Sequence, residues 1–349
     1  SKETSCRFKS GPGHQIIKSG SMSNKKIRIG FIGYGNFSKL RKNILEELNS
    51  VNLVGYYDTF NKSSDLPRFD TLNDLLDKVD SVLISVPPIY APNYVSEALS
   101  QGKDVFCEKP AAVSLDELLV VEKNLHKKSI LGYGLNHRVH PSIQKIKKIL
   151  EENHMGKVLW ARGRYGKEVG EEYVDGWRCD YNLNGGGILI DQGIHMIDLI
   201  NFLFGDMEVV SSILSNNYLN LPNVEDNAFI TLANKNKKIS ASVHSTITQW
   251  RYIFSLEIFC QRGSIILNGL RTNSGNYGRE ILTISPNLHN MFYKEDVVEE
   301  FKENISWETE MRSFVESCLS KSKYKYAGYN DVKELTSLID KVYEKSLWI

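Results

Sequence analysis

The segment from Gly185 to Asp198 carries side chains suited to proton transfer. Three consecutive glycines, which let backbone approach a ligand closely, lead into an apolar helical pattern whose polar positions are Asp191, His195 and Asp198. Spacings of four and three residues put these three side chains on one face of an α-helix. A carboxylate there can fix the tautomer of the imidazole while the imidazole moves a proton. Taken alone, the pattern more often marks a helix N-terminus with a structural core histidine, so the rest of the chain must decide.

A second group of residues is suited to binding a dinucleotide. The apolar stretch 26–32 predicts a strand, residues 33–38 form a Gly-x-Gly-x-x-Ser turn, and apolar residues at helical spacing follow. In such a unit the N–H groups of the turn and the helix N-terminus face the diphosphate of the cofactor. Ser38 replaces the last glycine of the motif and is small enough for close packing of helix on strand. The residues expected at the cofactor are Gly33, Gly35, Asn36 and Phe37.

An acidic residue at the end of the next predicted strand indicates which dinucleotide is bound. Asp58 follows the strand 52–57 and stands 23 positions after Gly35. A carboxylate there can hydrogen-bond both ribose hydroxyls and would repel a 2′-phosphate, so NAD is preferred over NADP. The alternative is that Asp58 only caps the turn after the strand. The glycine turn before it favours the cofactor interpretation.

Three more predicted strands end in polar or conformationally special residues. Strands at 81–86, 104–107 and 130–135 alternate with helices at 94–101 and 115–127, and open α/β sheets bind ligands at the carboxyl ends of their strands. A lysine at such an end can polarise a substrate hydroxyl, and its pKa is expected to fall beside a positively charged nicotinamide. A surface lysine before a helix is the simpler alternative. The residues concerned are Ser85, Pro87, Tyr90, Glu108, Lys109, Asn136 and Arg138.

The chain changes character after residue 140, which we take as the end of a Rossmann domain spanning 22–140. In the second domain, 141–349, a polar stretch at 166–184 holds aromatic residues and Arg178. Such residues can stack on a sugar ring and bind a hydroxyl, carboxylate or phosphate, or they can anchor the loop, and both interpretations stay open. Predicted helices and strands of this domain lie at 141–150, 158–165, 209–214, 228–232, 239–244, 253–260, 264–267 and 307–318, with a last helix capped by Asn330.

Composition narrows the functional class. The 349 residues carry 43 basic and 42 acidic side chains, so no basic face and no nucleic acid partner are expected. No apolar run approaches the ~20 residues of a membrane span. The five cysteines, Cys6, Cys107, Cys179, Cys260 and Cys318, lack Cys-x-x-Cys spacing, which argues against a disulfide framework and a zinc knuckle and fits a reducing cytoplasm. Residues 1–21 are expected to be an expression leader or a disordered arm, with Met22 the natural start.

Five motifs in order resemble the Gfo/Idh/MocA oxidoreductases, the glucose-fructose oxidoreductase and inositol dehydrogenase family. They are Gly33-x-Gly35 with Asp58, Ser85-Val86-Pro87-Pro88, Glu108-Lys109-Pro110, Asn136-x-Arg138 and Gly185-Gly186-Gly187-x-x-x-Asp191-x-Gly193-x-His195-x-x-Asp198. The resemblance extends from Met22 to the carboxyl terminus. It favours the acid–base interpretation of Asp191 and His195 over the structural one.

The resemblance implies an α/β fold with two parts. An N-terminal Rossmann dinucleotide-binding domain would precede a C-terminal α+β domain with a large, mostly antiparallel open sheet that mediates a homodimer or homotetramer. A terminal helix would pack back toward the Rossmann domain. The family moves a hydride between a nicotinamide and a secondary carbon of a sugar, cyclitol or related alcohol. Two departures, Tyr90 where many members have histidine and Ser38 in place of glycine, concern the surroundings of the cofactor.

The hypothesis is therefore a cytoplasmic NAD-dependent dehydrogenase or ketoreductase acting on a sugar, cyclitol or nucleotide-activated sugar. By the resemblance, His195 takes the hydroxyl proton, Asp191 holds the imidazole and balances its charge, and Lys109 donates a hydrogen bond to the oxygen. The expected substrate contacts are Lys109, Arg138, Trp177, Arg178, Asp191 and His195. The alternative is a catalytically silent NAD-binding regulator of the same fold. A metal enzyme using Asp191, His195 and Cys179 lacks supporting ligand spacing, so no metal is expected. Substrate identity and direction stay open.

Overall fold

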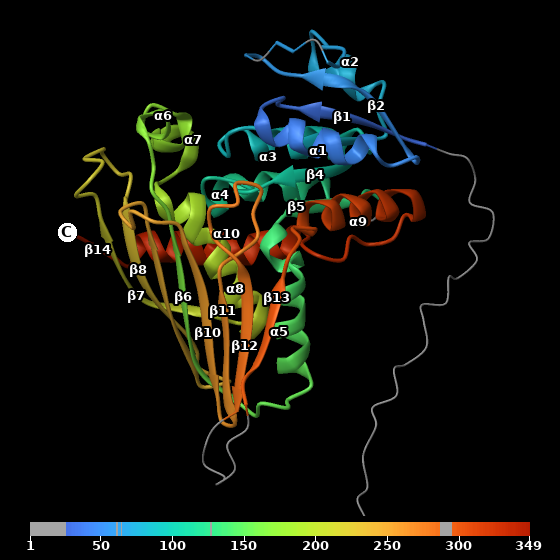
Figure 1. Cartoon of the computed structure of the whole chain (residues 1–349). Helices are drawn as coiled ribbons and strands as arrows, with labels where there is room; N and C mark the ends of the chain where they lie inside the picture. The colour runs from blue at the N-terminus through green and yellow to red at the C-terminus, as the bar shows by residue number, and fades with distance from the viewer. Residues whose placement is uncertain (1–25, 61, 64, 126–127, 287–294) are drawn as a thin grey trace, which may run out of the picture.

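The computed structural model describes residues 26–60, 62–63, 65–125, 128–286 and 295–349. The predicted leader at 1–21, the start at Met22 and Cys6 lie outside the described residues. The chain forms two sheets. In Figure 1 the first lies at the upper right and the second at the lower left, with helices packed between and around them.

The first sheet is the predicted Rossmann unit. It has five parallel strands in the order β2-β1-β3-β4-β5. Its strands are β1 (Ile27–Ile32), β2 (Val51–Tyr57), β3 (Ser81–Ile84), β4 (Asp104–Glu108) and β5 (Leu131–Gly134), and its helices are α1 (Asn36–Glu46), α2 (Leu72–Leu76), α3 (Ala91–Ser100) and α4 (Leu115–Leu118). All four residues of β3 are buried, as expected for a strand covered on both faces.

Strand order reverses at β1, which has β2 on one side and β3 on the other. Open α/β sheets bind ligands in the crevice outside the carboxyl ends of the strands at this point. The glycine turn that begins at Gly33 follows β1, and Ser85 follows β3. The amide of Ser85 donates to the carbonyl of Ile32 at 2.9 Å, so the two strand ends lie side by side.

The second sheet has nine strands in the order β13-β12-β11-β10-β6-β9-β8-β7-β14. Neighbours are antiparallel except for the pairs β6–β9 and β7–β14, which confirms the mostly antiparallel expectation. The strands are β6 (Val158–Gly166), β7 (Glu208–Ser215), β8 (Asn227–Asn234), β9 (Ile239–Thr246), β10 (Ile253–Cys260), β11 (Gly263–Asn268), β12 (Glu280–Pro286), β13 (Val297–Phe301) and β14 (Ser346–Trp348).

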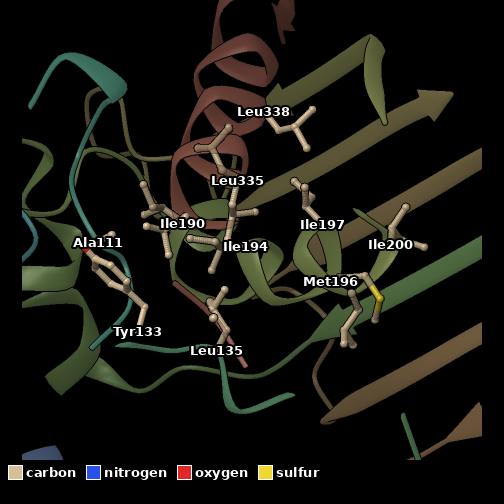
Figure 2. Close-up of a cluster of buried hydrophobic side chains, with 14 of the residues drawn as sticks. Ala111, Tyr133, Leu135, Ile190, Ile194, Met196, Ile197, Ile200, Leu335 and Leu338 are labelled. Carbon is tan, nitrogen blue, oxygen red and sulfur yellow. The ribbon is translucent and has the colours of Figure 1, made fainter. Parts of the chain in front are cut away.

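Three helices cover one face of this sheet: α5 (Pro141–Glu151), α8 (Ile194–Phe204) and α10 (Tyr329–Glu344) (Figure 1). The central one, α8, has a buried apolar surface on almost every side. Figure 2 shows Ile190, Ile194 and Ile197 lying near Leu335 and Leu338 of α10. On its other side Met196 lies against β6, where a β-carbon on Gly163 would lie 2.4 Å from the Met196 side chain. These contacts fix α8, and the residues just before it, relative to both sheets.

The helix α9 (Ser306–Ser320) packs onto the first sheet although it follows the second in sequence. Its apolar residues join the cluster built by β1, β2 and α1. Arg41 of α1 is fully buried there and donates to Glu108 at 2.8 Å and to Glu310 of α9 at 2.7 Å. Trp307 and Phe106 cover the guanidinium, with ring centroids 4.1 and 4.7 Å from its carbon. The part of the molecule built around the first sheet is therefore completed by a late segment of the chain.

Several expected boundaries were wrong. The helix expected at 115–127 is one turn of α4 followed by a 3₁₀ turn at Leu119–Asn124, and residues 126–127 lie outside the described part. Asn330 does not cap α10, because the helix begins at Tyr329 and the amide of Gly328 donates to Asp331. The polar stretch before the triple glycine contains three short turns, α6 (Glu171–Val174), a 3₁₀ turn at Trp177–Cys179 and α7 (Tyr181–Asn184).

One stretch of the described chain, Tyr181–Phe204, is long and apolar enough by length and composition to cross a membrane, with a mean hydropathy of 1.3. No such run was expected from the sequence. In the structure 78% of its 18-residue apolar window is buried inside the protein, and its core is the α8 packing shown in Figure 2. By its surroundings this stretch, which ends in α8, belongs to the protein core.

Candidate active site

The glycine turn after β1 has the geometry of a phosphate-binding turn. Gly33 has a φ of 79°, and a β-carbon there would lie 2.4 Å from the carbonyl oxygen of Ser85. Gly35, which caps α1, has no atom within 4 Å of the β-carbon position, so its backbone is open to an approaching group. The hydroxyl of Ser38 donates to the carbonyl of Gly33 at 2.6 Å. The serine thus closes the turn in place of the motif's last glycine.

Asp58 lies beside this turn at the end of β2. Its carboxylate accepts the amide of Tyr34 at 2.6 Å and the amide of Phe60 at 2.8 Å. It therefore caps a turn, as the simpler interpretation had it, while standing next to the residues expected to bind the cofactor. Its backbone carbonyl accepts two bonds from the exposed Arg68, at 3.1 and 3.3 Å.

The other residues expected at the cofactor have mixed surroundings. Ser85 and Pro87 are partly exposed, Tyr90 is exposed and Phe37 is exposed on the first turn of α1, while the carboxylate of Glu108 is paired with Arg41. Asn136 is buried, and its side chain bonds to Ser306 at 3.3 Å and His137 at 3.1 Å. This contact ties the end of β5 to the start of α9.

Asp191 is the centre of a charged cluster built from four elements. Lys109, at the end of β4, donates to the backbone carbonyl of Asp191 at 2.6 Å and lies 3.7 Å from its carboxylate. Lys167, just after β6, donates to that carboxylate at 2.6 Å, Tyr173 donates at 3.0 Å, and Nε of Arg178 lies 3.5 Å away. One carboxylate thus faces three cations.

The electrostatics of this cluster follow from burial and charge. Burial alone would raise the pKa of the Asp191 carboxyl, but Lys167, Lys109 and Arg178 together lower it well below its usual range. Burial lowers the pKa of Lys109 to about 8, an effect that Asp191 opposes. Asp191 is therefore a permanent anion, while Lys109 is close to the point at which it can exchange a proton near neutral pH.

The expected pairing of Asp191 with His195 is not present. Among the described residues, the Asp191 carboxylate bonds to Lys167 and Tyr173 and makes no hydrogen bond to His195. The reason is local: Leu189–Gly193 form a π-helical turn, which inserts a residue relative to the α-helical spacing assumed from sequence. Asp198 also differs from expectation, because it pairs with Arg138 instead of facing the site.

His195 lies in a stack of imidazoles. Its ring lies parallel to that of His137, with centroids 3.8 Å apart, and its Nδ1 is buried without a hydrogen-bond partner among the described residues. In the neighbouring ring, Nε2 of His137 bonds to the hydroxyl of Tyr165 at 3.0 Å. Burial, with the charge of Lys109 close by, holds the pKa of His195 well below its ordinary value, and burial does the same for His137. His195 is therefore a neutral imidazole able to accept a proton.

Arg138 serves the fold in this structure. It is buried, donates to Asp198 through Nε and Nη2 at 2.9 and 2.6 Å, and pairs with Asp331 of α10 at 2.6 Å. The predicted substrate contact of Arg138 finds no support here, because its guanidinium is held between α8 and α10. Trp177 and Arg178 do reach the Asp191 cluster, with the guanidinium carbon of Arg178 4.5 Å from the Trp177 ring and 5.7 Å from the Phe37 ring.

The triple glycine approaches protein rather than a ligand. A β-carbon on Gly187 would lie 2.0 Å from the carbonyl oxygen of Glu225, and one on Gly186 would lie 1.9 Å from the hydroxyl of Tyr343. The buried Glu225 carboxylate accepts the amides of Gly187 and Leu189 at 2.9 and 2.8 Å. The glycines are needed because this carboxylate and its backbone occupy the space where side chains would stand. The expectation that the backbone of these glycines approaches a ligand was wrong.

Several residues of the site were missed or left without a role by sequence reasoning: Arg41, His137, Tyr165, Lys167, Glu225 and Trp307. The sequence indicates little about their roles. A lysine after a strand or a glutamate in a loop, for example, has no motif around it. Within the described ranges, no group of three or more His, Cys, Asp or Glu residues has the geometry of a metal site. The four described cysteines are free and buried.

The sheet topology and the turn after β1 define the class of an NAD(P)-binding oxidoreductase. A family model described as an oxidoreductase family with an NAD-binding Rossmann fold matches residues 27–134, and the GFO/IDH/MocA C-terminal domain matches residues 143–266. The chain belongs to the GFO/IDH/MocA family, as its motifs indicated.

Relatives with known names include sugar and cyclitol dehydrogenases. Glucose-6-phosphate 3-dehydrogenase of Bacillus subtilis is 27% identical over 211 residues, which is 57% of this chain and 60% of that protein. The match thus spans about three fifths of that relative. Inositol 2-dehydrogenase of Rhizobium meliloti is 22% identical over 280 residues, 76% of this chain and 83% of that protein.

Solved structures share the fold of the whole chain. A levoglucosan dehydrogenase in complex with NADH has a TM-score of 0.78 at 16% identity, covering 92% of this chain and 98% of that one. A 3-ketoreductase from Actinomadura kijaniata in complex with NADP and TDP-benzene has a TM-score of 0.77 at 18% identity, covering 93% and 99%. At these identities the likeness concerns architecture alone.

Replacing Gly187 with alanine tests the packing of the triple glycine. The new β-carbon would collide with backbone rather than with a flexible side chain, so we expect the free energy of unfolding to fall by about 1–3 kcal/mol. Gly170→Ala is the matched control, because no atom lies within 4 Å of its β-carbon position. Urea unfolding of both variants measures the difference. Equal stability of the two would show that the turn can move away from Glu225.

Proposed function

We propose that this chain transfers a hydride between a nicotinamide cofactor and a secondary hydroxyl or keto carbon of a sugar, cyclitol or nucleotide-activated sugar. The observation that carries the proposal is the meeting of Lys109, from the cofactor half, with Asp191 and the neutral His195 from the other half. The names of the dehydrogenases related to this chain support the substrate class.

The residues present fit a dinucleotide. The open position at Gly35, the left-handed Gly33 and the neighbouring Asp58 carboxylate form a turn into which a diphosphate and a ribose can be received. The residues proposed to hold the cofactor are Gly33, Gly35, Asn36, Phe37, Asp58, Ser85, Pro87, Tyr90, Glu108, Lys109 and Asn136. A bound nicotinamide supplies or accepts the hydride.

The proton steps belong to residues of this chain. His195, neutral because of its burial, accepts the hydroxyl proton of the alcohol. Lys109 donates a hydrogen bond to the same oxygen and stabilises the charge that develops on it. Asp191 is proposed to act through the two lysines that it binds, and not through the imidazole. The stack on His137 holds the ring of His195 in one orientation.

Replacing His195 or Lys109 with alanine tests the assignment. Removing a positioned general base costs on the order of 10² to 10⁴ in rate, so turnover should fall by that amount in His195→Ala. Removing a donor to the developing charge costs about 10² to 10³, which is the fall expected in Lys109→Ala. The dissociation constant for NADH, followed by fluorescence, should change little in His195→Ala, because His195 is not among the residues proposed to hold the cofactor. His154→Ala is the control, because this histidine is exposed at the surface. The substrate comes from a screen of free sugars, inositols and nucleotide sugars for NADH formation.

Two results would speak against this assignment. Near-normal turnover in both variants would remove His195 and Lys109 from the chemistry. Tight NADH binding without turnover on any substrate would favour a regulator that keeps the fold and has lost catalysis.

NAD is proposed as the preferred cofactor because of Asp58. A carboxylate at this point repels the 2′-phosphate of NADP, and like charges held together cost several kcal/mol. Asp58→Asn should therefore lower the NAD to NADP ratio of kcat/KM at least about tenfold. In the double variant Asp58→Asn/Arg68→Gln, the gain in kcat/KM with NADP should be lost, because the guanidinium of Arg68 lies beside this position and donates to the backbone carbonyl of residue 58. A wild-type enzyme that uses both cofactors equally would refute the proposal.

A homo-oligomer through the second sheet is also proposed. The sheet face opposite α8 and α10 exposes large apolar side chains, among them Trp160, stacked on Phe259, and Phe229, stacked on His244. Exposed aromatic side chains are enriched in protein–protein contacts. Sedimentation velocity should show a dimer or tetramer, and Phe229→Glu should shift it toward monomer. Lys148→Glu, on the exposed surface of α5, is the control, and a monomeric wild type would disprove the proposal.

A further inference from the structure

The cluster around Asp191 carries more positive charge than its own residues neutralise. Lys109, Lys167 and Arg178 surround one carboxylate, and their side chains are only 16%, 13% and 30% exposed. Charges held away from water are stable only when they are paired. Three cations and one anion leave two positive charges to be balanced.

No other carboxylate of the described residues pairs with these three cations to complete that balance. Glu108 and Glu310 share Arg41, and the carboxylate of Glu225 accepts the backbone amides of Gly187 and Leu189. Six further titratable neighbours are neutral at pH 7, because burial raises the pKa of the tyrosine hydroxyls and the Cys179 thiol and lowers that of the imidazoles. They are Tyr165, Tyr173, Tyr277, Cys179, His137 and His195.

The cofactor does not supply it at the reacting end either. The negative charge of a dinucleotide is on its diphosphate, for which the turn at Gly33 and Gly35 is built. The oxidised nicotinamide ring carries a positive charge. A bound NAD would therefore add to the excess beside Lys109.

Arg178 has the side chain best placed to receive an anion. Its guanidinium makes no hydrogen bond to any described residue, and its Nε lies 3.5 Å from the carboxylate of Asp191. Aromatic rings of Trp177 and Phe37 lie within cation–π distance of its guanidinium carbon and hold it in place. A guanidinium edge left unbonded in this way can donate two parallel bonds to a carboxylate or phosphate.

Lys167 stands on the other side of the same carboxylate. Its ammonium donates one bond to Asp191 and lies 4.3 Å from the centroid of the Tyr173 ring, and an ammonium has three donors. Lys109 is engaged by the Asp191 carbonyl and is proposed for the reacting oxygen. The two remaining cations, Lys167 and Arg178, both approach Asp191 from the segment that follows β6.

We infer that the substrate of this chain carries an anionic group, a carboxylate or a phosphate, and that Arg178 and Lys167 bind it. The inference rests on the proposed function and names its substrate class: sugar acids or sugar phosphates in preference to neutral sugars. It assigns the segment after β6 the role of choosing the substrate, while Lys109 and His195 serve the reacting carbon. The two sources of the anion are separated by the substrates used in the test.

The test compares three substrates that differ in one substituent: glucose, glucose 6-phosphate and glucuronate. With saturating NAD, we expect kcat/KM for one of the two anions to exceed that for glucose by about 100-fold or more. Arg178→Gln should lower this anion-to-neutral ratio by about 10- to 100-fold, mainly through KM. Lys167→Gln should lower the same ratio. Arg178→Lys should give a ratio between those of the wild type and Arg178→Gln, because lysine keeps the positive charge but lacks the planar, two-pronged guanidinium. Arg312→Gln, on exposed α9 surface, is the control.

Other results would overturn the inference. Glucose used as well as both anions would do so, as would equal losses on all three substrates in Arg178→Gln. An NADH dissociation constant that rises as much as KM in that variant would make Arg178 a ligand of the cofactor diphosphate instead.

Failure of the proposed function can be told apart from failure of the inference. If no sugar is oxidised, the proposed function fails, and the rise in Tm on adding each compound to the NADH-bound protein still tests the anion site. A rise with glucose 6-phosphate or glucuronate but not with glucose, lost in Arg178→Gln, supports the inference. No rise with either anion overturns it.

Discussion

The attraction between one buried carboxylate and three cations is the interaction on which the site depends. Asp191 draws together Lys109 from the end of β4, Lys167 from the end of β6 and Arg178 from the connecting segment. Without the anion these cations would repel one another in a poorly solvated space. The two halves of the molecule meet here because Lys109 belongs to the first sheet and Asp191 to the second domain. The negative charge of Asp191 therefore helps to align the part of the molecule around the first sheet with the part around the second sheet.

Asp191 is itself placed by backbone that has little freedom. The amides before it are bound by Glu225, whose pKa burial raises to about 7, and the π-turn that contains Asp191 continues into the tightly packed α8. A π-turn moves a side chain relative to regular helical spacing, and such turns are frequent at functional sites. Here it turns Asp191 toward the lysines and leaves His195 in the imidazole stack. Rigid packing on one side and irregular backbone on the other together orient the two groups.

Sequence reasoning recovered the architecture and most strand ends, because apolar periodicity and glycine turns are local properties. It placed Lys109 and Asp191 in one site, and the structure brings them within 3.7 Å. It failed where geometry depends on distant partners. The π-turn cannot be seen in residue spacing, Glu225 fills the space beside the glycines from 38 residues away, and Arg138 meets Asp198 across 60 residues. Three strands at the edges of the second sheet, β12, β13 and β14, were missed; β13 is rich in charge and β14 has three residues.

The position of α9 bears on how the protein is made. Arg41 and Glu310 are 269 residues apart in the chain, yet they form one buried pair under the cofactor sheet. At about 5–20 residues per second, a ribosome needs roughly 15–50 s to synthesise the segment between them. During that time the surface of β1 and α1 that α9 later covers is open, and Arg41 has Glu108 but not Glu310 as a partner. The first sheet of a nascent chain is thus a natural target for chaperones that hold exposed apolar surface, and it is completed only after most strands of the second sheet have been synthesised.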